Sequence, residues 1–296
     1  MKKIAFTFLG IICIIALTQC NTTTTKTATS IDSTARTNPD TGNVTANWKI
    51  GVQMWTFRMF TFAEALDKVD SAGVKYIEAF WGQPLGAGMK DSFGIRMSEE
   101  NRAKLKQLLQ KKGISIVAMG VIRPETREEW KKAFDLAKEF GLSYITAEPL
   151  KNQWDMVDSM AGSYGIKVAI HDHPRPNPYW SPDSVLAAIS GHPNIGDCAD
   201  VGHWARSGLN PVDCLKELAG HVYGVHLKDI TKFNDTHSPD TVVSKGVIDF
   251  PAIFQELKRQ HFSGMFSIEH ESNWYHSVPD VIATVKYYNE QVAKLK

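Results

Sequence analysis

Apolar stretches recur along the chain, and each of the eight runs into a polar or ionisable residue. The stretches cover residues 50–55, 74–80, 114–121, 142–148, 166–173, 195–201, 222–228 and 265–271. Between them, apolar residues keep helical spacing, as Phe62, Leu66 and Val69 do in the first interval. Strands that alternate with helices predict a parallel sheet. Eight such units favour an α/β fold of the (β/α)8 TIM-barrel type, a parallel eight-stranded barrel with outer helices, over a doubly wound open sheet.

Short sequence signals mark where the helices begin and end. Thr126 and Glu129 have the spacing of a capping box. Pro182 and Pro211 follow the cap residues Ser181 and Asn210. A glycine lies between each helical segment and the next strand, where we expect it to end the helix in the left-handed conformation. These glycines are Gly73, Gly113, Gly141, Gly165, Gly191, Gly220 and Gly264.

The first 19 residues have the features of a lipoprotein-type signal peptide. Lys2 and Lys3 precede an apolar run over residues 4–17, which is too short to span a bilayer. The run ends in Leu17-Thr18-Gln19-Cys20, which resembles a bacterial lipoprotein cleavage box with Cys20 as the lipidated residue. The alternative is an ordinary secretory signal with a chance cysteine, because Gln19 departs from the usual small residue. We expect a protein of the cell envelope, lipid-anchored at Cys20 and facing the periplasm.

Composition separates a tether from a folded domain. Residues 20–47 are rich in Thr, Ser and Asn and nearly devoid of large apolar side chains, so we expect a flexible tether there. Residues 48–296 are expected to form the catalytic TIM-barrel domain. With 33 Lys and Arg against 32 Asp and Glu, no net field favours nucleic acid or an anionic membrane. Cys198 falls mid-strand and Cys214 on a predicted helix, so no structural disulfide is required.

Ionisable side chains lie at the ends of the predicted strands. The set includes Glu78, Glu148, His171, Asp200, His226 and Glu269. A parallel barrel brings these ends to one rim, where enzymes of this fold keep their active sites. Because side chains alternate along a strand, His173, Lys228 and Glu271 share the faces of their neighbours two residues earlier. Buried charges are costly unless they are paired or bound to a metal, so the sequence predicts a divalent metal site at this rim.

Three segments resemble the xylose-isomerase-like TIM-barrel superfamily, which includes sugar phosphate isomerases and epimerases. They are Asp200-Val201-Gly202-His203, Val225-His226-Leu227-Lys228-Asp229 and Ile268-Glu269-His270-Glu271, and the similarity covers roughly residues 48 to 290. The resemblance implies one divalent ion, usually Mn, Mg, Co or Zn, held by Glu, Asp, His and Glu from successive strands. Asp200, His226 and Glu269 match three of these positions.

The first ligand does not match the family pattern. Many epimerases place a glutamate near the end of strand five, where this chain has His171-Asp172-His173. Glu148, which closes strand four, can supply the missing carboxylate from the neighbouring rim position. We therefore expect Glu148 as the first ligand, with His171 as the alternative or as a fifth ligand. A mixed oxygen and nitrogen set suits Mn, Co or Zn better than Ca.

The expected chemistry is proton abstraction next to a metal-bound carbonyl. The candidate bases are Glu148, Glu269, His171 and Lys228. His203 resembles the substrate-binding histidine of the family, although a residue orienting Asp200 would also fit. The remaining residues expected to bind substrate are Trp55, Glu78, His173 and Trp180. Trp81, Tyr179 and Trp180 lie in long loops at the mouth, where they either stack on a sugar ring or close the loops.

These features predict a metal-dependent isomerase or epimerase that acts on a non-phosphorylated sugar or keto-sugar. Export and the lack of an Arg and Lys cluster at the rim argue against a phosphorylated substrate. The first alternative is a lyase that eliminates a β-substituent from 3-keto-glycosides at the same site. The second is a non-catalytic glycan-binding lipoprotein. Asp235-Thr236-His237 mimics a ligand pair of abasic-site endonucleases, which share the fold, but the neutral charge balance opposes DNA.

Overall fold

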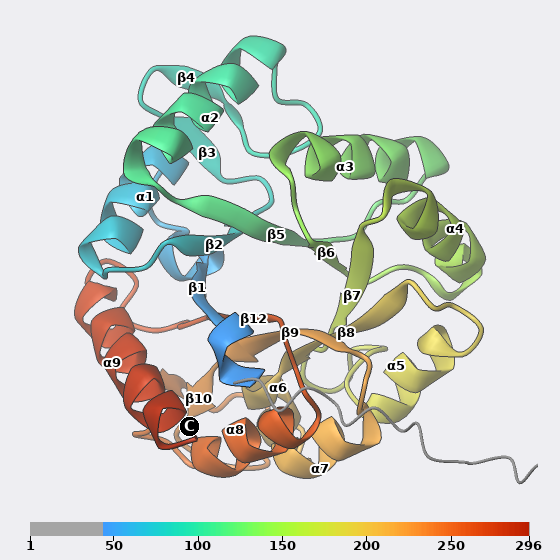
Figure 1. Ribbon diagram of the computed structural model, residues 1–296, viewed down its shortest axis with the longest axis vertical. Coiled ribbons are helices and arrows are strands. Elements are labelled where there is room, and N and C mark those ends of the chain that lie inside the picture. The colour runs from blue at the N-terminus through green and yellow to red at the C-terminus, as the bar shows by residue number, and fades with distance from the viewer. Residues whose placement is uncertain (1–43, 296) are drawn as a thin grey trace, which may run out of the picture. The chain divides into compact units, whose positions relative to one another are not determined.

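A closed barrel of eight parallel strands forms the centre of the computed structural model, which describes residues 44–295 (Figure 1). Its strands are β1 (Lys49–Gln53), β2 (Tyr76–Phe80), β5 (Ser115–Ile122), β6 (Tyr144–Ala147), β7 (Lys167–His171), β8 (Ile195–Asp200), β9 (Val222–Leu227) and β12 (Met265–Ile268). Each pairs with its neighbour in chain order, and β1 also pairs with β12, which closes the barrel. The predicted fold class is confirmed, and all eight predicted strands are present.

Helices form a ring around these strands (Figure 1). They are α1 (Phe62–Ser71), α2 (Glu99–Lys112), α3 (Arg127–Phe140), α4 (Trp154–Tyr164), α5 (Pro182–Ile189), α6 (Val201–Arg206), α7 (Pro211–Glu217), α8 (Phe250–Arg259) and α9 (Val278–Lys294), with short 3-10 turns η1 (Val44–Asn47), η2 (Met54–Phe57) and η3 (Lys151–Gln153). The predicted capping box is present: Thr126 accepts from the Glu129 N–H, and Glu129 accepts from the Thr126 N–H. Both bonds satisfy N–H groups that lack a partner within the helix.

The barrel interior is filled from several strands at once. Ala118, Tyr144, Ala169, Cys198 and Met265 form a buried cluster inside it. Small residues make room for the larger ones: a Cβ at Gly224 would lie 2.4 Å from the Tyr144 hydroxyl. The interior is therefore a packed core that supports the rim above it. Cys198, in this core, and Cys214, on α7, are free thiols.

Two antiparallel hairpins that the sequence pattern does not predict lie in the long loops at the mouth. One pairs β3 (Pro84–Gly86) with β4 (Met89–Ser92), and the other pairs β10 (Asp229–Ile230) with β11 (Asp240–Thr241). The Asp229 carboxylate organises the second loop by accepting four backbone N–H bonds, from Ile230, Ser244, Gly246 and Ile248. These strands are too short for periodicity to reveal them.

Two predictions need correction: where the ordered domain begins, and the left-handed conformation expected for Gly264. Val44–Asn47 forms η1 and Thr45 is buried, so ordered structure begins before residue 48. Gly264 does not have a positive φ, unlike Gly113, Gly141 and Gly165. A Cβ at Gly264 would lie 2.4 Å from the Tyr223 carbonyl oxygen, so close approach of the backbone explains this glycine.

The predicted signal peptide over residues 1–19, the lipidated Cys20 and the tether as far as residue 43 lie outside the described residues. Among residues 44–295, no helix is both long enough and apolar enough to cross a membrane.

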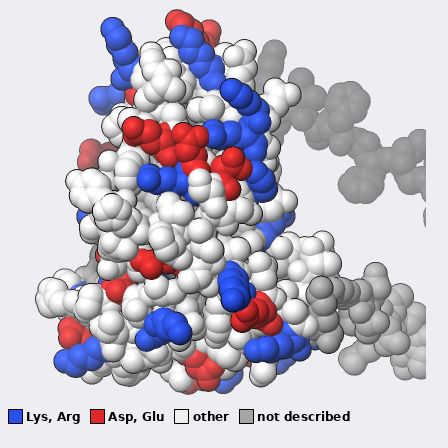
Figure 2. Space-filling view, turned by 90° about the vertical axis from the view of Figure 1, so that its left-hand side faces the viewer, with Lys and Arg blue, Asp and Glu red and all other residues white. Residues whose placement is uncertain are grey.

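Charges of both signs are interspersed on the face shown in Figure 2, without a broad patch of one sign. Several pair between neighbouring elements. Lys75 Nζ lies 2.6 Å from Asp70 Oδ1, and Lys112 Nζ lies 2.5 Å from Asp67 Oδ1. Such exposed pairs contribute little to stability. The concentrated charge of the molecule lies instead inside the mouth of the barrel.

Candidate metal centre and active-site cavity

Four side chains meet at the carboxyl ends of consecutive strands. His171 ends β7, Asp200 ends β8, His226 lies near the end of β9 and Glu269 follows β12. One donor atom from each lies within 4.8 Å of the others, and all four residues are buried. We call this set the inner cluster. Its assembly depends on barrel closure, because each strand contributes one residue.

The donor atoms of the inner cluster face one another. His171 Nε2 lies 3.0 Å from His226 Nδ1 and 3.6 Å from Asp200 Oδ2. His226 Nδ1 lies 3.2 Å from Glu269 Oε2. Two imidazole nitrogens and two carboxylate oxygens form a set that suits Zn, Mn or Co.

Asp200 supplies the test of whether a cation fits. Its Oδ1 accepts the His203 N–H at 2.9 Å, which caps α6 and fixes the carboxylate. Its Oδ2 is buried and accepts no hydrogen bond from any described residue. The same oxygen lies 3.1 Å from Lys228 Nζ, a contact close enough for an ion pair. A buried carboxylate oxygen that is aimed at other donors and lacks a hydrogen bond is what a metal ligand requires. The residues fit a divalent ion.

Lys228 balances the charge of this region. Its buried ammonium lies 2.8 Å from Glu269 Oε2 and 2.6 Å from Glu271 Oε1, besides Asp200. Burial alone would lower the pKa of Lys228, but the carboxylates of Asp200, Glu269 and Glu271 hold it well above its usual range. In this geometry Lys228 is a cation rather than a base. Its contacts therefore argue against the predicted role as proton acceptor.

Glu78 lies behind the inner cluster and not in the cavity. It is fully buried, and its Oε2 lies 2.8 Å from His226 Nε2 and accepts a 2.9 Å bond from Ser267 Oγ. This contact leaves His226 Nδ1 directed toward Asp200 and Glu269. The geometry does not support the prediction that Glu78 binds substrate, because Glu78 is fully buried and does not line the cavity at the mouth. A carboxylate behind a ligating histidine orients the ring instead.

Glu148 and His173 form a second group, which we call the outer cluster. The Oε2 atom of Glu148 accepts bonds from Arg123 Nε at 2.7 Å and Asn177 Nδ2 at 3.2 Å, and its Oε1 contacts His173 Nδ1. Burial would raise the pKa of Glu148, but these partners, with His173 first, lower it to about 2. Glu148 thus lies outside the inner cluster, in which His171 is the fourth donor, although Glu148 also forms a possible ligand group with His171 and His173.

A cavity of about 420 Å³ opens over both clusters. Trp55, His173, His203, Glu269 and Glu271 are among the residues that line it. Trp55, His173 and His203 therefore lie where a substrate would contact them. The prediction for Trp180 is not supported: it does not line this cavity, and the Arg175 guanidinium covers its ring at 5.3 Å. Asp235 and His237, the mimic of an endonuclease pair, belong to neither cluster.

Several residues that hold Asp200 and Glu271 in place were not predicted from the sequence. Asp172 accepts the Asp200 N–H at 2.7 Å. Asp240 accepts the Glu271 N–H at 2.7 Å and pairs with Arg206, whose guanidinium also donates to the Ser238 carbonyl. The spacing of Arg206 from His203, one helical turn, is a signal that could have indicated Arg206. Nothing in the sequence indicates Asp240, because the hairpin that carries it is not predictable.

Comparisons with known proteins agree with this architecture. The family model described as "Xylose isomerase-like TIM barrel" matches residues 66–294. A crystal structure of an uncharacterised protein from Parabacteroides distasonis ATCC 8503 is 36% identical, with a TM-score of 0.67 over 82% of this chain and 99% of that chain. An IOLI protein crystallised with a zinc atom is 19% identical, with a TM-score of 0.65 over 83% of this chain and 98% of its own.

An inosose dehydratase of Clostridium botulinum (strain Alaska E43 / Type E3) is 27% identical over 139 residues, which are 42% of this chain and 47% of that protein. The match thus spans about half the length of that relative. Because the family model covers most of the chain, including every residue of both clusters, the chain belongs to the xylose isomerase-like TIM barrel family.

Proposed function

We propose that this protein is a metal-dependent enzyme that isomerises or epimerises a non-phosphorylated sugar by removing a proton next to its carbonyl group. His171, Asp200, His226 and Glu269 would hold the ion. A divalent ion bound there supplies Lewis-acid chemistry, which makes a neighbouring C–H bond easier to deprotonate. A structural neighbour with the same fold was crystallised with a zinc atom, which supports a metal site in this fold.

The observation that carries the proposal is the pairing of Glu148 with His173. His173 lines the cavity, its Nδ1 contacts the Glu148 carboxylate, and its Nε2 has no hydrogen-bond partner among residues 44–295. A carboxylate behind an imidazole fixes the orientation of the ring. His173 is therefore the residue that we assign to move the proton, with Glu148 orienting it. His171 and Glu269, which the sequence also suggested as bases, are occupied as ligands.

The cation content of the cavity supports a substrate without phosphate. Arg123 is the one Lys or Arg among the described residues that line the central cavity, and it pairs with Glu148 at 2.6 Å. No unpaired lysine or arginine among the described residues that line the central cavity is thus left to bind a phosphate dianion.

Elimination is the second candidate, because one named relative is a dehydratase, an enzyme that removes water. Elimination begins with the same proton abstraction and then expels a β-substituent, which on a 3-keto-glycoside is the aglycone. A single acid–base pair could serve both steps, with His173 returning the proton to the leaving oxygen.

Incubation in heavy water with a panel of free keto-sugars and 3-keto-glycosides tests both candidates. Isomerisation or epimerisation incorporates deuterium into an intact sugar, whereas elimination releases the aglycone and leaves an unsaturated keto-sugar. With metal fully loaded, neither exchange nor release would indicate a glycan-binding protein instead.

The same assay tests the assigned pair. His173→Gln and Glu148→Gln should each slow exchange by about 10²-fold or more while metal stays bound. The double variant should be no slower than His173→Gln alone, because the two residues act as a unit. His192→Gln, at a histidine outside both clusters, is the matched control. Strictly additive losses would contradict the pairing.

We also propose that the chain is exported and lipid-anchored at Cys20, on the strength of the cleavage-box resemblance alone. Cys20→Ser should move the protein from the membrane fraction to the soluble periplasm. A wild-type protein that is already soluble after export would leave secretion without lipidation.

A further inference from the structure

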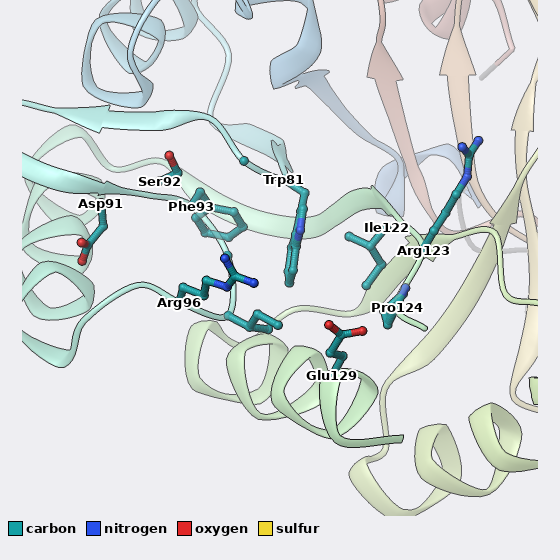
Figure 3. A pocket seen from close by; sticks show the side chains of 12 residues that line it. Trp81, Asp91, Ser92, Phe93, Arg96, Ile122, Arg123, Pro124 and Glu129 are labelled. Carbon is teal, nitrogen blue, oxygen red and sulfur yellow. The ribbon is translucent and has the colours of Figure 1, made fainter. Parts of the chain in front are cut away.

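A second cavity, of about 500 Å³, lies beside the central one. It is bounded by the β3–β4 hairpin on one side and by the start of α3 on the other (Figure 3). Trp81, Ile122 and Arg123 line both cavities, so the two share a wall. Each has the size of an ordinary small-molecule site. The mouth of the barrel therefore holds two adjoining compartments, and the inner and outer clusters lie at only one of them.

The second cavity, which we call the outer compartment, combines an aromatic surface with unpaired polar groups. Figure 3 shows the half-buried Trp81 ring standing in the middle of the wall, between Arg96 and Ile122, while Arg123 leads away from the cavity. Arg96 makes no hydrogen bond or ion pair with any described residue. Asp91 uses one carboxylate oxygen to hold Ser98 and Asn101, and Glu129 uses one to cap α3. The second oxygen of each has no hydrogen-bond partner among residues 44–295.

We propose that this compartment binds a second sugar ring, so that the substrate of the proposed reaction is a disaccharide or a related glycoside rather than a monosaccharide. The inference rests on the proposed function for the ring held at the inner cluster. A pyranose offers an apolar face that stacks on an indole and hydroxyl groups that both donate and accept. Trp81 supplies the stacking surface, Arg96 the donors, and the free oxygen of Glu129 an acceptor.

The charges argue against an anionic ligand in the same place. Two carboxylates, Asp91 and Glu129, line the compartment together with Arg96 and Arg123, and Arg123 is occupied by Glu148. With Arg123 paired, a phosphate or carboxylate group would meet two acidic side chains and one free basic side chain. A neutral, polyhydroxylated ring can accept hydrogen bonds from Arg96 and donate one to Glu129.

Binding can be measured without turnover. Titration calorimetry of the metal-loaded protein would compare methyl glucosides with the methyl glycosides of a panel of glucosyl disaccharides, in both of which the anomeric carbon is blocked, so that the carbonyl needed for the reaction cannot form. We expect at least one disaccharide to bind about tenfold or more tightly than any methyl glucoside, the gain of a hydrogen bond to a charged group. Arg96→Ala and Ser92→Phe, which alter the outer compartment alone, should remove that preference and leave methyl glucoside affinity unchanged. Arg127→Ala, at an exposed arginine nearby on α3, should change neither.

Equal affinity of every disaccharide and methyl glucoside would overturn the inference, as would variants that weaken both ligands equally or a lack of detectable binding by the whole panel. The heavy-water assay fails separately. Disaccharide preference without exchange would contradict the proposed reaction alone, and exchange without disaccharide preference would contradict the second-ring compartment alone.

Discussion

The inner and outer clusters differ in how their carboxylates are satisfied. Asp200 in the inner cluster keeps one buried oxygen free of hydrogen bonds and aimed at three other donors. Glu148 in the outer cluster has both oxygens engaged, by Arg123, Asn177 and His173. Both carboxylates are at strand ends and both are buried. The comparison teaches that position at the rim does not make a carboxylate a ligand. What separates Asp200 from Glu148 is one buried oxygen that lacks a hydrogen bond and lies among other donor atoms.

The largest expected effect separates the two clusters directly. Asp200→Asn should abolish binding of divalent metal, because it removes an anionic ligand while asparagine still caps α6. Glu148→Gln should keep stoichiometric metal. The metal content of each variant is measured by elemental analysis after dialysis against Zn, Mn or Co, and circular dichroism confirms that the variant is folded. Loss of metal in Glu148→Gln, or its retention in Asp200→Asn, would invert the assignment.

The next effect concerns charge balance in the inner cluster. Without metal, Lys228→Met leaves Asp200 and Glu269 buried without their cation and should lower the free energy of unfolding by about 3–5 kcal/mol. Saturating zinc should recover much of the loss, because the ion restores positive charge to the folded state only. Chemical denaturation with and without zinc measures this. The control Lys232→Met, at an exposed lysine 3.4 Å from Asp235, should change stability by less than about 0.5 kcal/mol.

A smaller effect tests the residue behind the inner cluster. Glu78→Gln should weaken metal binding by about 10- to 100-fold, because the His226 ring loses the carboxylate that orients it. Competition with a chelator measures the affinity. An unchanged affinity would mean that packing alone holds His226, and Ser267→Ala, which removes only a bond to Glu78, should have a weaker effect in the same direction.

The smallest effect is a pH dependence of the outer cluster. The folded-state pKa of Glu148 is lowered to about 2 from 4.5, so its ionised form stabilises the fold above pH 4.5. That contribution is lost as the pH falls from 4.5 toward 2. In metal-free protein, Glu148→Gln should lower stability by about 1–2 kcal/mol at neutral pH, a modest value because Arg123 is largely exposed.

The difference between wild type and Glu148→Gln should therefore shrink on acidification. Denaturation curves collected from neutral pH downward would show it. A difference that stays constant with pH would mean that the Glu148 bonds do not depend on its charge.

The barrel itself could be predicted from the sequence, because strand and helix periodicities are local properties that recur along the chain. Convergence of Asp200, His226 and Glu269 followed from strand order alone, since parallel strands must end at one rim. The choice between Glu148 and His171 could not be made in this way. It depends on Arg123 and Asn177, which reach Glu148 from β5–α3 and β7–α5 connections whose conformations no periodicity encodes.

Tertiary structure also decided which rim residues face the cavity. Glu78 and Glu269 were both predicted at strand ends, yet Glu78 lies in the middle of β2 and behind His226, while Glu269 follows β12 and lines the mouth. The second compartment depends on the β3–β4 hairpin, which brings Asp91 and Arg96 opposite Glu129 on α3. The sequence by itself determined the fold and the strand ends where ionisable groups gather. Packing between distant segments determined which of those groups are paired, hidden or free, because hydrogen-bond partners are set by contacts across the fold and not by position along the chain.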